Sequence, residues 1–150
     1  MVLPSRPGIL RAVIDQLRAA AEALGNGDPE PFASLFAADS EWRGVPDGRL
    51  WWKQMPTCHG PDEAREALRF AIDKRGGHGI DVRPEFTQVG ERIIGSTQWI
   101  DDDGNRRERF QVLTIRDGKI VDMQGCASRR AAERFAEKCA RKDSNLRPTA

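Results

Sequence analysis

Tyrosine is absent from this 150-residue sequence, and cysteine and histidine are scarce. Without a phenolic hydroxyl, every mechanism that needs a tyrosine is excluded. The three cysteines, Cys58, Cys126 and Cys139, are an odd number in a chain without a secretion signal, which argues against a disulfide framework. No CxxC or HxxxH spacing occurs, so we expect no metal site, and nothing in the sequence implies a cofactor.

Long apolar runs are also missing. No stretch approaches the roughly 18 residues that a membrane span needs, and charged residues interrupt the N-terminus too early for a signal peptide. Lys plus Arg number 24 against 23 for Asp plus Glu, so the chain has no general attraction to nucleic acid. We therefore expect a cytoplasmic protein that binds neither membranes nor nucleic acid. The length predicts one domain over residues 1–140, followed by a flexible polar tail at 141–150.

Apolar periodicity and turn residues predict helices first and strands afterwards. The predicted helices cover residues 9–24, 29–37, 61–73 and 128–139. A short strand is predicted at 40–44, and longer strands at 80–89, 92–100, 107–115 and 119–126. Strands so closely spaced pair as antiparallel neighbours, which predicts an α+β fold with helices packed on one face of a sheet.

The hairpin expected at 107–126 assigns side chains to the two faces of that sheet. Its turn is interpreted as a three-residue loop, with Gly118 in the left-handed conformation. The strand pairs that follow are Ile115 with Lys119, Leu113 with Val121, Gln111 with Met123, and Arg109 with Gly125. The apolar members of this set, Leu113, Ile115, Val121 and Met123, predict that it forms the core face.

This assignment turns Arg109 and Gln111 inward, and we expect Ser96 and Gln98 on the neighbouring strand to join them. Buried polar side chains need partners or water, and a few convergent polar groups between apolar walls are typical of a small-molecule site. If the hairpin were displaced by one residue, Arg109 and Gln111 would lie on a solvated face instead.

The segment at 41–60, EWRGVPDGRLWWKQMPTCHG, holds three of the four tryptophans and is too rich in Gly and Pro for a helix. Because exposing so much aromatic surface is unfavourable, we expect Trp42, Trp51 and Trp52 to form walls or a lid over a cavity, with Met123 inside it.

Three segments carry a resemblance to a known family: GNGDPEPFASLFAADSEW, CHGPDEAREAL and RFQVLTIRDGKIVDMQGCASRRAAERF, within residues 9–137. Their order and spacing resemble the nuclear transport factor 2-like superfamily, which includes SnoaL-like polyketide cyclases and ketosteroid isomerases. The resemblance implies an α+β cone, in which a curved antiparallel sheet wraps around N-terminal helices and encloses a cavity. It also implies a homodimer through the outer sheet face, which would present Phe110, Val112 and Thr114.

The catalytic residues of these relatives do not carry over. The positions of the isomerase tyrosine and two acids fall near Ala20, Gly44 and Gln111. The limonene epoxide hydrolases of the same superfamily carry Arg-x-Asp where this chain has Arg109-Phe110-Gln111, and an amide cannot accept a proton from water as a carboxylate does. The sequence therefore favours binding over any reaction known in the family.

Two functions stay open from the sequence. One is a small-molecule-binding protein for an apolar or planar, possibly anionic ligand, or an enzyme that would be a cofactor-independent isomerase, lyase or hydrolase. Its catalytic candidates are His59, Arg109 and Gln111. His59 is either a general base at the cavity rim or a local hydrogen-bonding residue, and Arg109 meets either an anionic ligand or the carboxylate of Glu41 or Asp39. The other function is a non-catalytic dimeric module.

Overall fold

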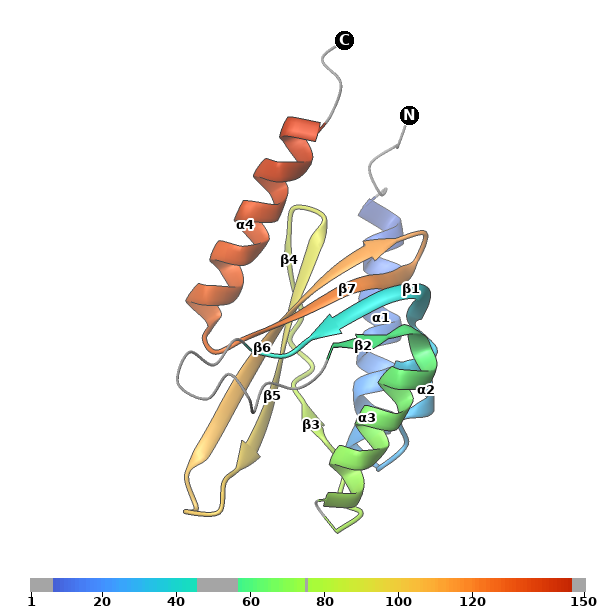
Figure 1. Ribbon diagram of the computed structural model, residues 1–150, viewed down its shortest axis with the longest axis vertical. Coiled ribbons are helices and arrows are strands. Elements are labelled where there is room, and N and C mark those ends of the chain that lie inside the picture. The colour runs from blue at the N-terminus through green and yellow to red at the C-terminus, as the bar shows by residue number, and fades with distance from the viewer. Residues whose placement is uncertain (1–6, 46–56, 75, 147–150) are drawn as a thin grey trace.

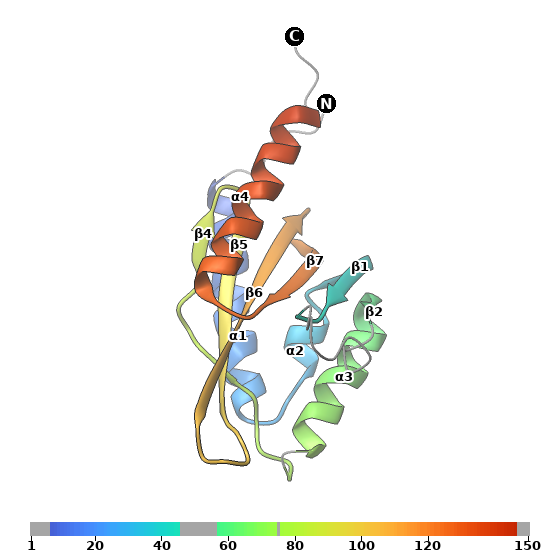
Figure 2. The same ribbon diagram turned by 60° about the vertical axis from the view of Figure 1, so that its left-hand side comes forward.

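The computed structural model describes residues 7–45, 57–74 and 76–146, and shows three helices on one side of a curved sheet and a fourth on the other (Figures 1 and 2). The helices are α1 (Pro7–Gly25), α2 (Glu30–Ala33), α3 (Gly60–Lys74) and α4 (Arg129–Leu146). The strands are β1 (Phe36–Arg43), β2 (Cys58–His59), β3 (Asp81–Val82), β4 (Thr87–Val89), β5 (Arg92–Ile100), β6 (Arg106–Arg116) and β7 (Lys119–Cys126). None of the described helices is long and apolar enough to cross a membrane.

The sheet has the order β2-β1-β7-β6-β5-β3, with β4 also paired to β5. Strands β5, β6 and β7 form the predicted antiparallel meander. The sheet as a whole is mixed rather than antiparallel, because β1 runs parallel to β7. Two boundaries also differ from the prediction: β1 begins at Phe36, and the strand expected at 80–89 divides into β3 and β4.

The β6–β7 hairpin turns more tightly than expected. Asp117 and Gly118 both have positive φ, 53° and 76°, as in the two-residue type I′ turn that an Asp-Gly pair favours. A bulge at Val121 then places Leu113 opposite Met123 and Gln111 opposite Gly125. The predicted register of these pairs is therefore wrong by two residues. Because side chains alternate with a period of two, the inward assignment of these four residues still holds.

The inner face of the sheet packs against α1, α2 and α3. Helix α1 contributes Leu10, Val13, Leu17 and Leu24, and the strands contribute Ile93, Leu113 and Ile120, among others. Gly79 allows the end of α1 to meet the start of β3, since a Cβ there would lie 2.0 Å from the carbonyl oxygen of Gly25. These contacts hold the helices against only part of the inner face.

The outer face carries a second apolar cluster beneath α4. Ile94, Phe110 and Val112 of the sheet pack there against Ala132 and Ala136. The last helix, predicted to end at residue 139, continues as α4 through Leu146. Helices thus cover both faces of the sheet, and two of the three residues expected at a dimer interface are buried, Phe110 at 7% and Val112 at 0% exposure, whereas Thr114 is half-buried.

Candidate functional site

A cavity of about 230 Å³ lies between the inner face of the sheet and helix α3. Most of its wall is apolar. Its described lining comes from the end of α1, from α2 and α3, from β1 and the two residues after it, and from five further strand and loop segments: Leu24, Phe32, Trp42, Gly44, Val45, Ala67, Leu68, Ala71, Ile80, Val82, Phe86, Gly95, Ser96, Thr97, Trp99, Arg109, Gln111, Leu113, Met123 and Gly125.

The most buried level of the cavity wall is apolar. Strand register places Trp42, Met123 and Leu113 side by side across β1, β7 and β6, and Leu113 and Met123 are 2% and 3% exposed. The Trp42 ring stacks on Phe36 with centroids 6.0 Å apart, and Phe36 in turn packs on Phe32 at 5.8 Å. An aromatic wall therefore borders this level, and both Trp42 and Met123 line the cavity.

The next level consists of Gln111 between two glycines. Gly95 of β5 and Gly125 of β7 are its cross-strand partners. A Cβ on Gly95 would lie 2.7 Å from the Phe86 ring, and a Cβ on Gly125 would lie 3.0 Å from the Val45 nitrogen. The glycines thus let Phe86 and Val45 close in on either side. The Gln111 amide makes no hydrogen bond to any residue that the structure describes, so it is available to a bound molecule.

Arg109 lies at the rim, where its side chain is exposed to solvent. Its guanidinium carbon is 5.4 Å from the centre of the Trp99 ring, a cation–π contact that fixes its direction. The alternative that Arg109 pairs with Glu41 or Asp39 is wrong. Glu41 bonds to Arg43 at 3.2 Å, and Asp39 bonds to Arg116 at 2.7 Å.

The predicted face of β5 is wrong by one residue. Thr97 is the partner of Arg109, and Gly95 is the partner of Gln111, so the odd-numbered residues of β5 face inward. Gln98 is not in the cavity wall, and its amide bonds to Glu108 at 3.0 Å. Ser96 borders the cavity, but its partner is Phe110 of the outer cluster, which directs its side chain outward. Sequence reasoning missed Thr97 and Trp99. The same period-two alternation predicts both if the odd-numbered residues of β5, rather than the even-numbered ones, are assigned to the inner face.

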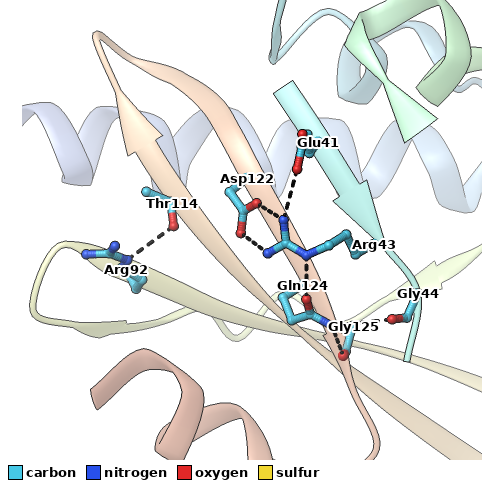
Figure 3. A network of polar contacts seen from close by, with 8 residues as sticks. All are labelled: Glu41, Arg43, Gly44, Arg92, Thr114, Asp122, Gln124 and Gly125. Atoms are coloured by element: carbon cyan, nitrogen blue, oxygen red, sulfur yellow. Dashed lines mark hydrogen bonds and ion pairs between the residues drawn. The ribbon is translucent and has the colours of Figure 1, made fainter. Parts of the chain in front are cut away.

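A polar network on the outer face supports this wall from behind (Figure 3). Arg43 of β1 bonds to both carboxylate oxygens of Asp122, at 2.6 and 2.8 Å, and to Gln124 at 2.7 Å. Gln124 donates in turn to the carbonyl oxygens of Gly44 and Gly125. Burial alone would lower the pKa of Arg43, but Asp122 and Glu41 raise it above its ordinary value. The network clamps β1 to β7 where Trp42 and Gly44 enter the cavity.

His59 and the two loop tryptophans do not add to the described wall. His59 is exposed, is paired with Glu41, and lies outside the lining. Its backbone nitrogen donates to the carboxylate of Glu63 at 3.1 Å, a local contact at the start of α3. The backbone bond does not involve the imidazole, so the choice between a rim base and a local hydrogen-bonding residue stays a prediction for His59. Trp51 and Trp52 lie outside the described residues.

The described wall offers charge and hydrogen bonds, but no group that accepts a proton near neutral pH. Arg109 is the one ionisable side chain among its described members. Gly44 and Gln111 line the cavity at the two positions where the resemblance to isomerases would place acids, while Ala20 lies in the core at 1% exposure. Within the described residues, no group of three His, Cys, Asp or Glu side chains could hold a metal ion. This chemistry suits binding and orientation.

Comparison with solved structures defines the class of fold. An NTF2-like protein of unknown function from Mesorhizobium loti has a TM-score of 0.61 at 16% identity, covering 85% of this chain and 97% of its own. TerC, crystallised with polyporic acid, has a TM-score of 0.57 at 23% identity, covering 83% and 98%. A proposed polyketide cyclase from Sinorhizobium meliloti has a TM-score of 0.53 at 16% identity, covering 74% and 93%.

The chain therefore has the nuclear transport factor 2-like fold: helices followed by a curved, unclosed mixed sheet that forms an α+β cone. No protein-family model matches the sequence, and no curated protein matches it. The solved structures named above share at most 23% sequence identity with this chain, so they establish its fold but not its activity.

Proposed function

We propose that this chain is a small-molecule-binding protein of the SnoaL-like kind, whose cone cavity holds a flat, largely apolar organic molecule. The observation that carries the proposal is the layered wall, with Trp42, Leu113 and Met123 at depth and one unengaged amide, Gln111, above them. Apolar walls with few, well-placed polar groups are typical of ligand sites.

The size of the cavity limits the ligand. An engineered apolar cavity of about 150 Å³ holds benzene, and drug-sized ligands occupy about 300 Å³ or more. At about 230 Å³, this cavity suits a molecule of one or two rings. Two neighbours of the same fold support an organic small molecule as the ligand: TerC was crystallised with polyporic acid, and another is a proposed polyketide cyclase.

Binding is a better-supported function than catalysis or association. No carboxylate or imidazole lies in the described wall, so the wall supplies orientation rather than proton transfer. The outer face does not support the alternative of a dimeric module, because α4 covers Phe110 and Val112. The third residue expected at a dimer interface, Thr114, accepts a hydrogen bond from Arg92 at 3.1 Å.

Ligand-observed NMR with 2-naphthol, a neutral two-ring probe, tests the proposal. Ala71→Phe would fill the cavity from α3, whereas Ala140→Phe places the same ring on α4, away from it. We expect 2-naphthol to bind wild type and Ala140→Phe alike and to bind Ala71→Phe at least about tenfold more weakly, because the ring occupies the ligand volume. Equal binding by Ala71→Phe, or no binding of any one- or two-ring aromatic to wild type, would contradict the proposal.

A further inference from the structure

Arg109 differs from its neighbouring arginines in what it contacts. Four other arginines of the sheet hold carboxylates: Arg43 with Asp122, Arg92 with Asp143, Arg107 with Asp101, and Arg116 with Asp39. No described carboxylate lies within ion-pairing distance of Arg109, and Trp99 is the group its guanidinium contacts. Among the described residues, Arg109 is therefore the one charged member of the cavity wall, and it has no carboxylate partner there.

The position of Arg109 suits an anion that enters from solvent. A guanidinium presents five N–H donors in a planar fork, and a carboxylate matches this fork with two parallel hydrogen bonds. The guanidinium carbon lies 5.4 Å from the centre of the Trp99 ring, and the guanidinium N–H donors make no hydrogen bond to the described residues, so they can bind a ligand. Because Arg109 is exposed at the rim, binding an anion there does not require moving the charge into the apolar interior.

Strand geometry orders the groups along the ligand. Leu113, Gln111 and Arg109 succeed one another at every second position of β6, so each step toward the mouth is about 6.7 Å. A molecule lying along β6 meets an apolar floor, then a neutral amide, then a cation. A single cation in the described wall matches a single negative charge better than two, since a second charge would lack a partner.

We propose that the ligand is an aromatic monocarboxylate, bound with its ring against Leu113 and Trp42 and its carboxylate on Arg109. This inference rests on the proposed binding function and adds the charge, the class and the direction of the ligand. Gln111 lies at the middle of such a molecule, where it hydrogen-bonds a carbonyl or hydroxyl substituent. Arg109 thus binds the carboxylate and Gln111 binds the polar substituent, while the apolar wall recognises the rest of the ligand by its shape.

Matched probes test the charge: 2-naphthoate and its neutral isostere 2-naphthamide, measured by calorimetric titration. Arg109→Gln removes the charge, and Arg106→Gln is its control, because Arg106 begins the same strand and lies outside the cavity wall. We expect wild type and Arg106→Gln to bind naphthoate about tenfold more tightly than naphthamide, since charge-assisted hydrogen bonds are roughly twice as strong as neutral ones. Arg109→Gln should lose this preference while its naphthamide affinity stays the same.

Added salt provides a second measurement. We expect it to reduce the preference for naphthoate in wild type and to leave the relative affinities of the two probes unchanged in Arg109→Gln, because the charges meet at an exposed rim. Equal affinities for naphthoate and naphthamide in wild type, or equal losses in Arg109→Gln and Arg106→Gln, would overturn the inference and leave the binding function intact. If neither probe nor 2-naphthol bound wild type, the proposed function would fail as well.

Discussion

One ion pair adds to the apolar contacts that attach α4 to the outer face, and replacing Asp143 by alanine should reveal its contribution. Arg92 is 8% exposed and donates to Thr114 at 3.1 Å and to both carboxylate oxygens of Asp143. Burial alone would lower the pKa of Arg92, but Asp143 raises it above its ordinary value. Asp143→Ala therefore leaves a buried charge with one neutral partner.

The magnitude follows from the exposure of the pair. Breaking a fully buried ion pair costs about 3–5 kcal/mol, and an exposed pair contributes about 0.2–1 kcal/mol. The side chains of Arg92 and Asp143 are 10% and 36% exposed, so the pair lies between these limits. We expect Asp143→Ala to lower the free energy of unfolding by about 1.5–3 kcal/mol, which corresponds to a fall in Tm of about 4–10 °C.

Urea denaturation followed by circular dichroism measures the loss, and the chain supplies a matched control. Asp39 and Arg116 form another aspartate–arginine pair, but their side chains are 66% and 58% exposed. We expect Asp39→Ala to cost less than about 1 kcal/mol. Asp143→Ala should also speed tryptic cleavage after Arg141 and Lys142, because α4 loses its outer attachment. Similar costs for the two variants would refute the reasoning that burial gives the Arg92–Asp143 pair its strength.

Three further predictions concern backbone and burial. Gly79→Ala should cost more than about 3 kcal/mol in urea denaturation, since its Cβ would meet the Gly25 carbonyl at 2.0 Å, whereas Gly25→Ala has open space and should be neutral; equal effects would be contrary evidence. Gly118→Ala should destabilise by about 1 kcal/mol because φ is +76°, and an unchanged Tm would count against the tight turn. Burial raises the pKa of Cys126, so the unfolded state ionises first and stability should fall as pH rises past the ordinary thiol range; Cys126→Ala should remove that part of the slope.

Local patterns predicted the outer frame of this fold well. The bounds of β5 and β7 agree with the prediction, because turn residues bracket both strands. On β6, the inward assignment of Gln111 and Leu113 holds although their partners were wrong, since an error of two residues preserves the pleat. A register error of an even number of residues therefore leaves the predicted face of each side chain unchanged.

Strand β5 shows where such reasoning failed. Ile93 and Ile94 are both buried, one in the inner cluster and one beneath α4. A strand covered on both faces loses the alternation of apolar and polar residues that identifies its core side. Ser96 and Gln98 were therefore chosen over Thr97 and Trp99, and nothing in the local pattern of residues 92–100 could have corrected the choice.

The sequence by itself determined which chemistry this protein lacks and where its elements begin: no tyrosine, no acid at the isomerase positions, and helices followed by a meander. Only the tertiary structure decided which side chains meet. Strand β1 pairs in parallel with β7, α4 covers the outer face, and Arg109 contacts the Trp99 ring. Each of these contacts depends on long-range register or packing. Periodicity reports the local face of an element, whereas a cavity depends on how distant elements are aligned.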